Sequence, residues 1–207
     1  MARRFNVTGS CDPQLHYMVD ITSRLKKIKE LIDSGAYFTI NRARQYGKTT
    51  TLSALAEYLK NDYIVISLDF QMLGNAEFSD ELVFSAAFSE YFVDTVNEDQ
   101  NMIELLDAPS LEELRIASKK TQLFSLRKLF TILSKLCKTA KKPIVLIIDE
   151  VDSATNNQVF LDFLAQLRAY YLKRRKLPIF QSVILAGVYD VKNIKIRIRS
   201  DAEHKVN

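Results

Sequence analysis

The residues with the clearest chemical potential lie where a short apolar run meets a polar loop. Tyr37–Ile40 is expected to form a strand, Gly47-Lys48-Thr49 ends the loop that follows, and a helix is expected from Thr50 to Asn61. Strand, loop, Gly-Lys-Thr and helix in this order are the context of a phosphate-binding P-loop. The N-terminus of the helix would offer backbone N–H groups and the positive end of its dipole to an anion.

The three residues of this motif have distinct tasks. Gly47 lets the backbone approach a phosphate oxygen. Lys48 would place its charge on the outer phosphates, and Thr49 would give its hydroxyl to Mg²⁺. The complete pattern also has an earlier glycine, and Arg42 stands at that position here. The alternative interpretation is therefore a lysine at an ordinary helix start.

An acidic motif follows a second apolar run, about 100 residues further along the chain. The run begins at Ile144 and ends in Asp149 and Glu150. Mg²⁺ takes oxygen ligands in a fixed geometry, so an acid at a strand end suits it. Asp149 would hold the metal through water, across the phosphates from Thr49, and Glu150 would polarise a water for attack on the γ-phosphate. Two exposed acids at the start of a loop are the alternative, but the two motifs together indicate ATP and Mg²⁺ as cofactors.

Four apolar runs of strand length alternate with helical patterns. They cover residues 37–40, 63–70, 144–150 and 182–188. This alternation predicts an α/β sandwich with a mostly parallel sheet and helices on both faces. In such sheets ligands bind at the carboxyl ends of the strands. Those ends carry the P-loop, Asp69, Asp149-Glu150 and Tyr189-Asp190.

Apolar periodicity and capping residues predict the helices. They are expected from Asp20 or Thr22 to Asp33, from Ser79 to Val96, from Thr121 to Lys138, and from Asn156 or Asn157 to Leu172. Ser110-Leu-Glu-Glu113 fits a capping box, so a short helix is expected to begin there. Residues 71–78 and 97–109 are expected to be loops. We expect one domain over residues 1–207, with an irregular segment at 1–19 and a frayed tail at 192–207.

Composition excludes several classes of protein. Hydrophobic residues make up 47% of the chain, charged residues 26%, and the net charge is +4, as in soluble globular proteins. No apolar run reaches the roughly 18 residues of a membrane helix. No signal peptide follows Met1, so a cytoplasmic protein without a membrane partner is expected. Two widely spaced cysteines and two histidines argue against a metal site built on those residue types.

The glutamate beside Asp149 resembles a particular division of P-loop ATPases, which includes AAA-type, STAND-type and RecA-like proteins. In that division an additional strand lies between the two strands that carry the motifs, and residues 182–188 would supply it. The chain contains no Asn-Lys-x-Asp motif for reading guanine. Adenine is therefore the expected base.

A closer resemblance is to bacterial AAA-like ATPases in which arginine replaces the first P-loop glycine. The segments Asn41–Thr49, His16–Asp20, Ile147–Asp152 and Val183–Asp190 are similar to their motifs, although Ala43 stands where proline is usual. The resemblance implies a three-layer P-loop NTPase sandwich and an N-terminal ATPase core, truncated before the fifth strand and the C-terminal lid. The residues expected to bind nucleotide are Arg44, Gln45, Tyr46, Gly47, Lys48, Thr49 and Thr50.

The leading hypothesis is an Mg²⁺-dependent ATPase core that couples hydrolysis to a conformational or assembly step, with Lys48 and Glu150 as catalytic residues. One alternative is an ATP-sensing switch with little hydrolysis, which the missing lid favours for the isolated chain. Another is a nucleic-acid-binding protein with an accessory nucleotide site, because Lys173–Lys176 and Lys192–Arg199 are basic. Solvated faces are the competing interpretation of both basic segments.

The protein is also a possible homo-oligomer, because several of its arginines could contact a neighbouring subunit. Arg42 and Arg44 would contact phosphate or a neighbouring subunit, or else form a salt bridge to the acids near Asp149. Arg168 is a candidate arginine finger or a solvated helix residue. Asp190 or Tyr189 is a candidate γ-phosphate sensor, although Asn, Ser or Thr is usual at that position. His16 and Tyr17 either line the adenine pocket or pack under the edge of the sheet.

Overall fold

The computed structural model describes residues 20–41, 47–119 and 124–188 of the chain. Its centre is a four-stranded sheet in the order β1-β4-β3-β2, and every neighbouring pair of strands is parallel. The strands are β1 (Tyr37–Asn41), β2 (Ile64–Asp69), β3 (Ile144–Asp149) and β4 (Ser182–Gly187). The predicted α/β fold with a parallel sheet is therefore confirmed, and β4 lies between β1 and β3.

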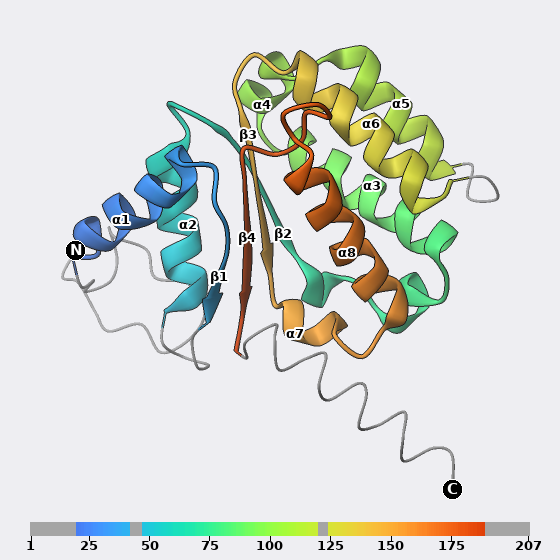
Figure 1. The fold of residues 1–207 in the computed structure, drawn as a ribbon, viewed down its shortest axis with the longest axis horizontal. Helices are drawn as coiled ribbons and strands as arrows, with labels where there is room; N and C mark the ends of the chain where they lie inside the picture. Colours follow the sequence, from blue (N-terminus) through green and yellow to red (C-terminus); the bar gives the residue numbers. More distant parts are fainter. Residues whose placement is uncertain (1–19, 42–46, 120–123, 189–207) are drawn as a thin grey trace, which may run out of the picture.

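Helices cover both faces of this sheet (Figure 1). One face is covered by α1 (Thr22–Asp33) and α2 (Lys48–Leu59), and the other by α3 (Glu81–Asn97), α5 (Ala108–Lys119), α6 (Leu126–Thr139) and α8 (Gln158–Leu172). The short helices are α4 (Gln100–Leu105) and α7 (Val151–Ala154), and the 3₁₀ turns are η1 (Phe70–Met72) and η2 (Asn75–Phe78). None of the described helices has the length and apolar character needed to cross a lipid bilayer.

Side-chain alternation along the strands divides the core into two clusters. Val65 of β2 and Val145 and Ile147 of β3 pack against the helices α1 and α2. Ile64 and Ile144, which begin the same strands, pack against the helices of the opposite face. Successive side chains of a strand point to opposite faces, so odd-numbered residues of β2 and β3 face α2.

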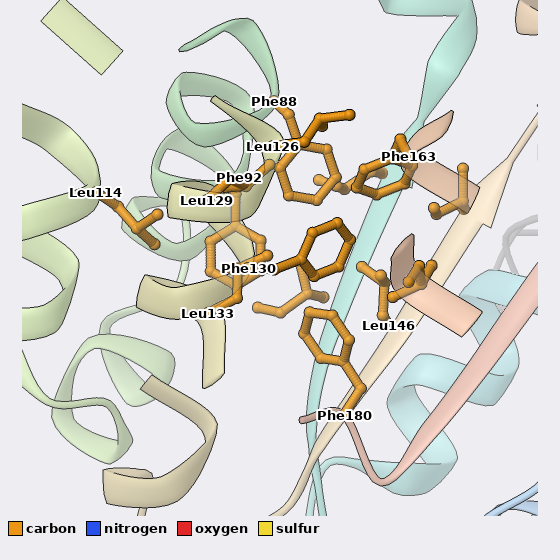
Figure 2. Packing of buried hydrophobic residues seen from close by; sticks show 14 of the residues in the cluster. Phe88, Phe92, Leu114, Leu126, Leu129, Phe130, Leu133, Leu146, Phe163 and Phe180 are labelled. Atoms are coloured by element: carbon orange, nitrogen blue, oxygen red, sulfur yellow. The ribbon is translucent and has the colours of Figure 1, made fainter. Parts of the chain in front are cut away.

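The larger cluster is rich in phenylalanine and leucine (Figure 2). The Phe163 ring of α8 lies 5.0 Å from the Phe88 ring of α3 and 5.5 Å from the Phe130 ring of α6, measured between centroids. All three side chains are fully buried. Such aromatic pairs add to the free energy gained by burial, and here they join three helices to one another.

Several helices begin or end where capping residues predict. Gly35, with φ of 70°, follows α1 and its N–H donates to the carbonyl of Ile32 at 2.8 Å, as expected for a helix C-terminus. The carboxylate of Asp80 accepts the N–H groups of Leu82 and Val83 at 2.7 and 3.0 Å at the start of α3. The hydroxyl of Ser125 accepts the N–H of Lys128, so α6 begins at Leu126 and not at the expected Thr121.

Other predicted boundaries were also wrong. The expected loop 97–109 contains α4, whose first N–H groups are capped by Asp99. The short helix expected from Ser110 begins at Ala108, because Asp107 accepts the Ser110 N–H and so takes the capping role. The expected loop 71–78 consists mainly of η1 and η2. An aspartate side chain can accept the backbone N–H two or three residues later, and this hydrogen bond stabilises the start of a helix.

The larger core should control stability. Leu133 of α6 is fully buried in it, whereas Leu172 at the end of α8 is 67% exposed. We expect Leu133→Ala to lower the free energy of unfolding by about 2–5 kcal/mol through lost burial and a cavity, and Leu172→Ala to change it by less than about 0.5 kcal/mol. Urea denaturation followed by circular dichroism measures both values. Equal losses in the two variants would contradict this division between core and surface.

Candidate functional site

The site begins at the start of α2, directly after Gly47. Gly47 has φ of 69° and ψ of 31°, a left-handed conformation that glycine adopts readily. Its carbonyl accepts both the N–H and the hydroxyl of Thr51, at 2.9 and 2.7 Å. The helix therefore starts at Lys48, two residues earlier than the predicted start at Thr50. The other predicted nucleotide-binding residues, Arg44, Gln45 and Tyr46, lie outside the described residues, as does Arg42.

Lys48 joins α2 to the end of β3. Its Nζ lies 2.8 Å from Oδ1 of Asp149 and 2.6 Å from Oε1 of Glu150. Asp149 is 6% exposed and Lys48 is 8% exposed, so this ion pair is largely shielded from water. Burial alone would lower the pKa of the Lys48 ammonium group, but hydrogen bonds to the two carboxylates outweigh it and raise the pKa. Lys48 therefore carries its positive charge at neutral pH.

Glu150 has an unusual backbone conformation. Its φ is 52°, which makes it the one described residue other than glycine with a positive φ. Its N–H donates to Oδ1 of Asp149 at 2.8 Å, and α7 begins at the next residue. For a glutamate, the left-handed backbone conformation costs free energy relative to the right-handed or extended one. Such conformations are concentrated at functional sites. Here the turn directs the Glu150 carboxylate back to Lys48.

Thr49 and Asp149 present oxygen atoms that fit a magnesium ion. Oγ1 of Thr49 lies 3.5 Å from Oδ2 of Asp149. Within the described part of the chain, no group of three or more His, Cys, Asp or Glu side chains could hold a metal by itself. An ion here would take one or two protein oxygens and complete its shell with water and phosphate, which is how Mg²⁺ is commonly held beside nucleotides. The residues present therefore fit the ion.

Asp152 links the end of β3 to the end of β4. The N–H of Val188 donates to its Oδ2. A Cβ on Gly187 would lie 2.6 Å from that oxygen and 2.9 Å from Cγ2 of Val151, so the close approach requires glycine. Sequence reasoning did not single out Gly187. The scarcity of glycine, five in 207 residues, is the signal that could have identified it.

The remaining candidates are only partly described. Arg168 is exposed on α8 with its guanidinium 5.9 Å from the centre of the Tyr37 ring. Within Lys173–Lys176, Arg174 stacks on Tyr171 at 4.1 Å and donates to the carbonyl of Gly35 at 3.2 Å, which is a structural role. His16, Tyr17, Tyr189, Asp190 and Lys192–Arg199 lie outside the described residues.

The close approach at Gly187 makes a direct prediction. Gly187→Ala forces a methyl group against Asp152 and Val151, so we expect a loss of about 1–3 kcal/mol in the free energy of unfolding. Gly74→Ala is the matched control, because its Cβ would meet only the flexible end of Glu77, at 3.1 Å. Thermal and urea denaturation compare the two. Unchanged stability in Gly187→Ala would show that the end of β4 can move away from Asp152.

Comparisons with known proteins agree with this geometry. A family model described as an AAA-like domain matches residues 13–199. Among solved structures, the fold is similar to that of the Walker-type ATPase PABY2304 of Pyrococcus abyssi, with a TM-score of 0.60 and 17% sequence identity, over 88% of this chain and 48% of that one. The chain thus spans about half the length of that ATPase. No curated protein sequence matches it significantly.

The family model covers most of the sequence, so the chain can be assigned to the family that this model describes. The AAA-like match supports an ATP-binding, ATPase-like function. The fold, the Gly-Lys-Thr helix start and the acids at the end of β3 are consistent with it. The chain therefore belongs to the AAA-like domain family of P-loop ATPases.

Proposed function

We propose that the chain is an Mg²⁺-dependent ATPase core that binds ATP between the start of α2 and the end of β3. The observation that carries this proposal is the contact of Lys48 Nζ with both Asp149 and Glu150, at 2.8 and 2.6 Å. It places one cation and two carboxylates at the carboxyl edge of a parallel sheet, where ligands of such folds bind.

Phosphate binding is assigned to the first turn of α2. Gly47, Lys48, Thr49 and Thr50 lie in the first turn of α2, at the positive end of the helix dipole. Lys48 would exchange its carboxylate partners for phosphate oxygens, with its ammonium still charged. A Cβ built on Gly47 would meet no atom of the described residues within 4 Å, which leaves its backbone open to a ligand on that side.

Thr49 and Asp149 are assigned to Mg²⁺, Thr49 as a ligand and Asp149 through water. When bound, the ion would neutralise charge on the phosphates. Asp149 is also held by a contact that does not depend on Lys48, from the Glu150 N–H. This contact orients the carboxylate before any ion arrives, which favours binding because less side-chain freedom is lost.

Glu150 is assigned as the residue that polarises the attacking water. Its side chain is 25% exposed, so water can reach it. It would accept a proton from that water while Lys48 holds the γ-phosphate. The link from Asp152 to the Val188 N–H would carry a change at the end of β3 to the end of β4, and we propose this as the route to a conformational step.

Removing the lysine tests the phosphate site. We expect Lys48→Met to weaken ATP binding roughly 10- to 150-fold, the loss of a charged hydrogen bond of about 1.5–3 kcal/mol. Lys60→Met is the matched control, since Lys60 is exposed at the other end of the same helix. Calorimetry with Mg²⁺ gives both affinities. Equal binding by the wild type and Lys48→Met would refute the assigned site.

Replacing the glutamate tests hydrolysis separately from binding. We expect Glu150→Gln to keep ATP affinity within a few-fold and to slow phosphate release about 10²- to 10⁴-fold, the usual contribution of a general base. Glu57→Gln, on the exposed side of α2, is the control. Wild-type protein that binds ATP without releasing phosphate would favour the ATP-sensing switch over the ATPase.

A further inference from the structure

The end of β2 places another carboxylate beside Asp149. The parallel register of β2 and β3 pairs Asp69 directly with Asp149. Both residues are odd-numbered members of strands whose odd residues Val65, Val145 and Ile147 pack toward α2. Because side chains alternate strictly along a strand, the Asp69 side chain lies on the same face of the sheet as Asp149. That is also the face toward which α2 presents Lys48 and Thr49.

A groove connects these residues. It has a volume of about 870 Å³ and runs along the outer edge of β2, between α2 and α4. Thr49, Asp69 and Asp149 all line it. The hydroxyl of Thr49 and the carboxylates of Asp69 and Asp149 therefore border one water-accessible space.

Asp69 is held firmly by contacts that are not ionic. Its N–H donates to Oη of Tyr91 at 2.9 Å, and its Oδ1 accepts the N–H of Gln71 at 2.9 Å. The next residue, Phe70, is fully buried among phenylalanines of the larger core. Among the described residues, Asp69 has no ion pair, whereas Asp149 is paired with Lys48. The Asp69 carboxylate is thus fixed in direction and forms no ion pair with the part of the chain that the structure describes.

We propose that Asp69 is a positioning residue of the Mg²⁺ site, and this rests on the proposed function of that site. Its carboxylate accepts hydrogen bonds from water molecules on the ion, while Thr49 and Asp149 hold the ion as assigned above. Mg²⁺ keeps several waters in protein sites, so acceptors around those waters contribute to its binding. Residues outside the ligand shell commonly change metal affinity 10- to 100-fold.

The test measures how much Mg²⁺ strengthens ATP binding. ATP affinity of the full chain is determined by calorimetry in Mg²⁺ and in EDTA, and the ratio of the two is compared between variants. We expect Asp69→Asn to reduce this ratio about 10- to 100-fold and to leave the affinity in EDTA unchanged. Electron paramagnetic resonance titration of Mn²⁺ into the ATP-bound protein, an independent readout, should show weaker ion binding by a similar factor.

The matched control is Asp99→Asn. Asp99 lines another wall of the same groove and accepts the N–H of the residue two positions later, as Asp69 does. Asparagine is as good a cap as aspartate, so both variants should fold, which circular dichroism verifies. Asp99→Asn should match the wild type in every binding experiment.

The outcomes separate this inference from the proposed function. If Mg²⁺ strengthens wild-type binding and Lys48→Met weakens ATP binding as expected above, but Asp69→Asn has the wild-type ratio, the role of Asp69 is wrong and the nucleotide site stands. A weaker affinity of Asp69→Asn in EDTA by the same factor would show a general structural effect and also overturn the inference. If the wild type binds no ATP, or binds it equally with and without Mg²⁺, the assigned magnesium site fails and the inference fails with it.

Discussion

The parallel register of β3 with its neighbours is the constraint on which the site depends. All six residues of β3 are buried, and because successive side chains point to opposite faces, a slip of one residue would turn Asp149 away from α2. That register brings Asp149 level with Asp69 and sets the turn in which Glu150 meets Lys48. Asp152, just beyond that turn, then reaches the end of β4. The chemistry of the site is therefore a consequence of how the strands pair.

Much of this arrangement could be predicted from the sequence, for identifiable reasons. The runs that became β2, β3 and β4 are nearly continuous in apolar residues, which is typical of strands covered on both faces. Such strands imply a parallel sheet, and the carboxyl ends of parallel strands share one edge. Lys48 and Asp149, about 100 residues apart, could thus be expected to meet.

Other features could not be predicted, because they depend on which of two residues caps a helix or on contacts between segments that are distant in the sequence. Ser110 and Asp107 can both cap α5, and in the structure Asp107 accepts the Ser110 N–H. The left-handed backbone of Glu150 and the contact at Gly187 arise only when two strand ends meet. Tyr91 reaches Asp69 from 22 residues away, and no local signal marks it. These contacts arise from tertiary packing rather than from local sequence preference.

The position of Phe70 has a mechanical consequence. Its ring lies within 6.5 Å of five other phenylalanine rings, measured between centroids, and these come from η2, α3 and α8. Protein interiors are nearly incompressible, so the backbone after Asp69 is not free to shift alone. Any appreciable displacement there must be shared by two long helices on the far side of the sheet. A small movement at the strand ends would consequently change the shape of the outer surface of α3 and α8, where another molecule could respond to it.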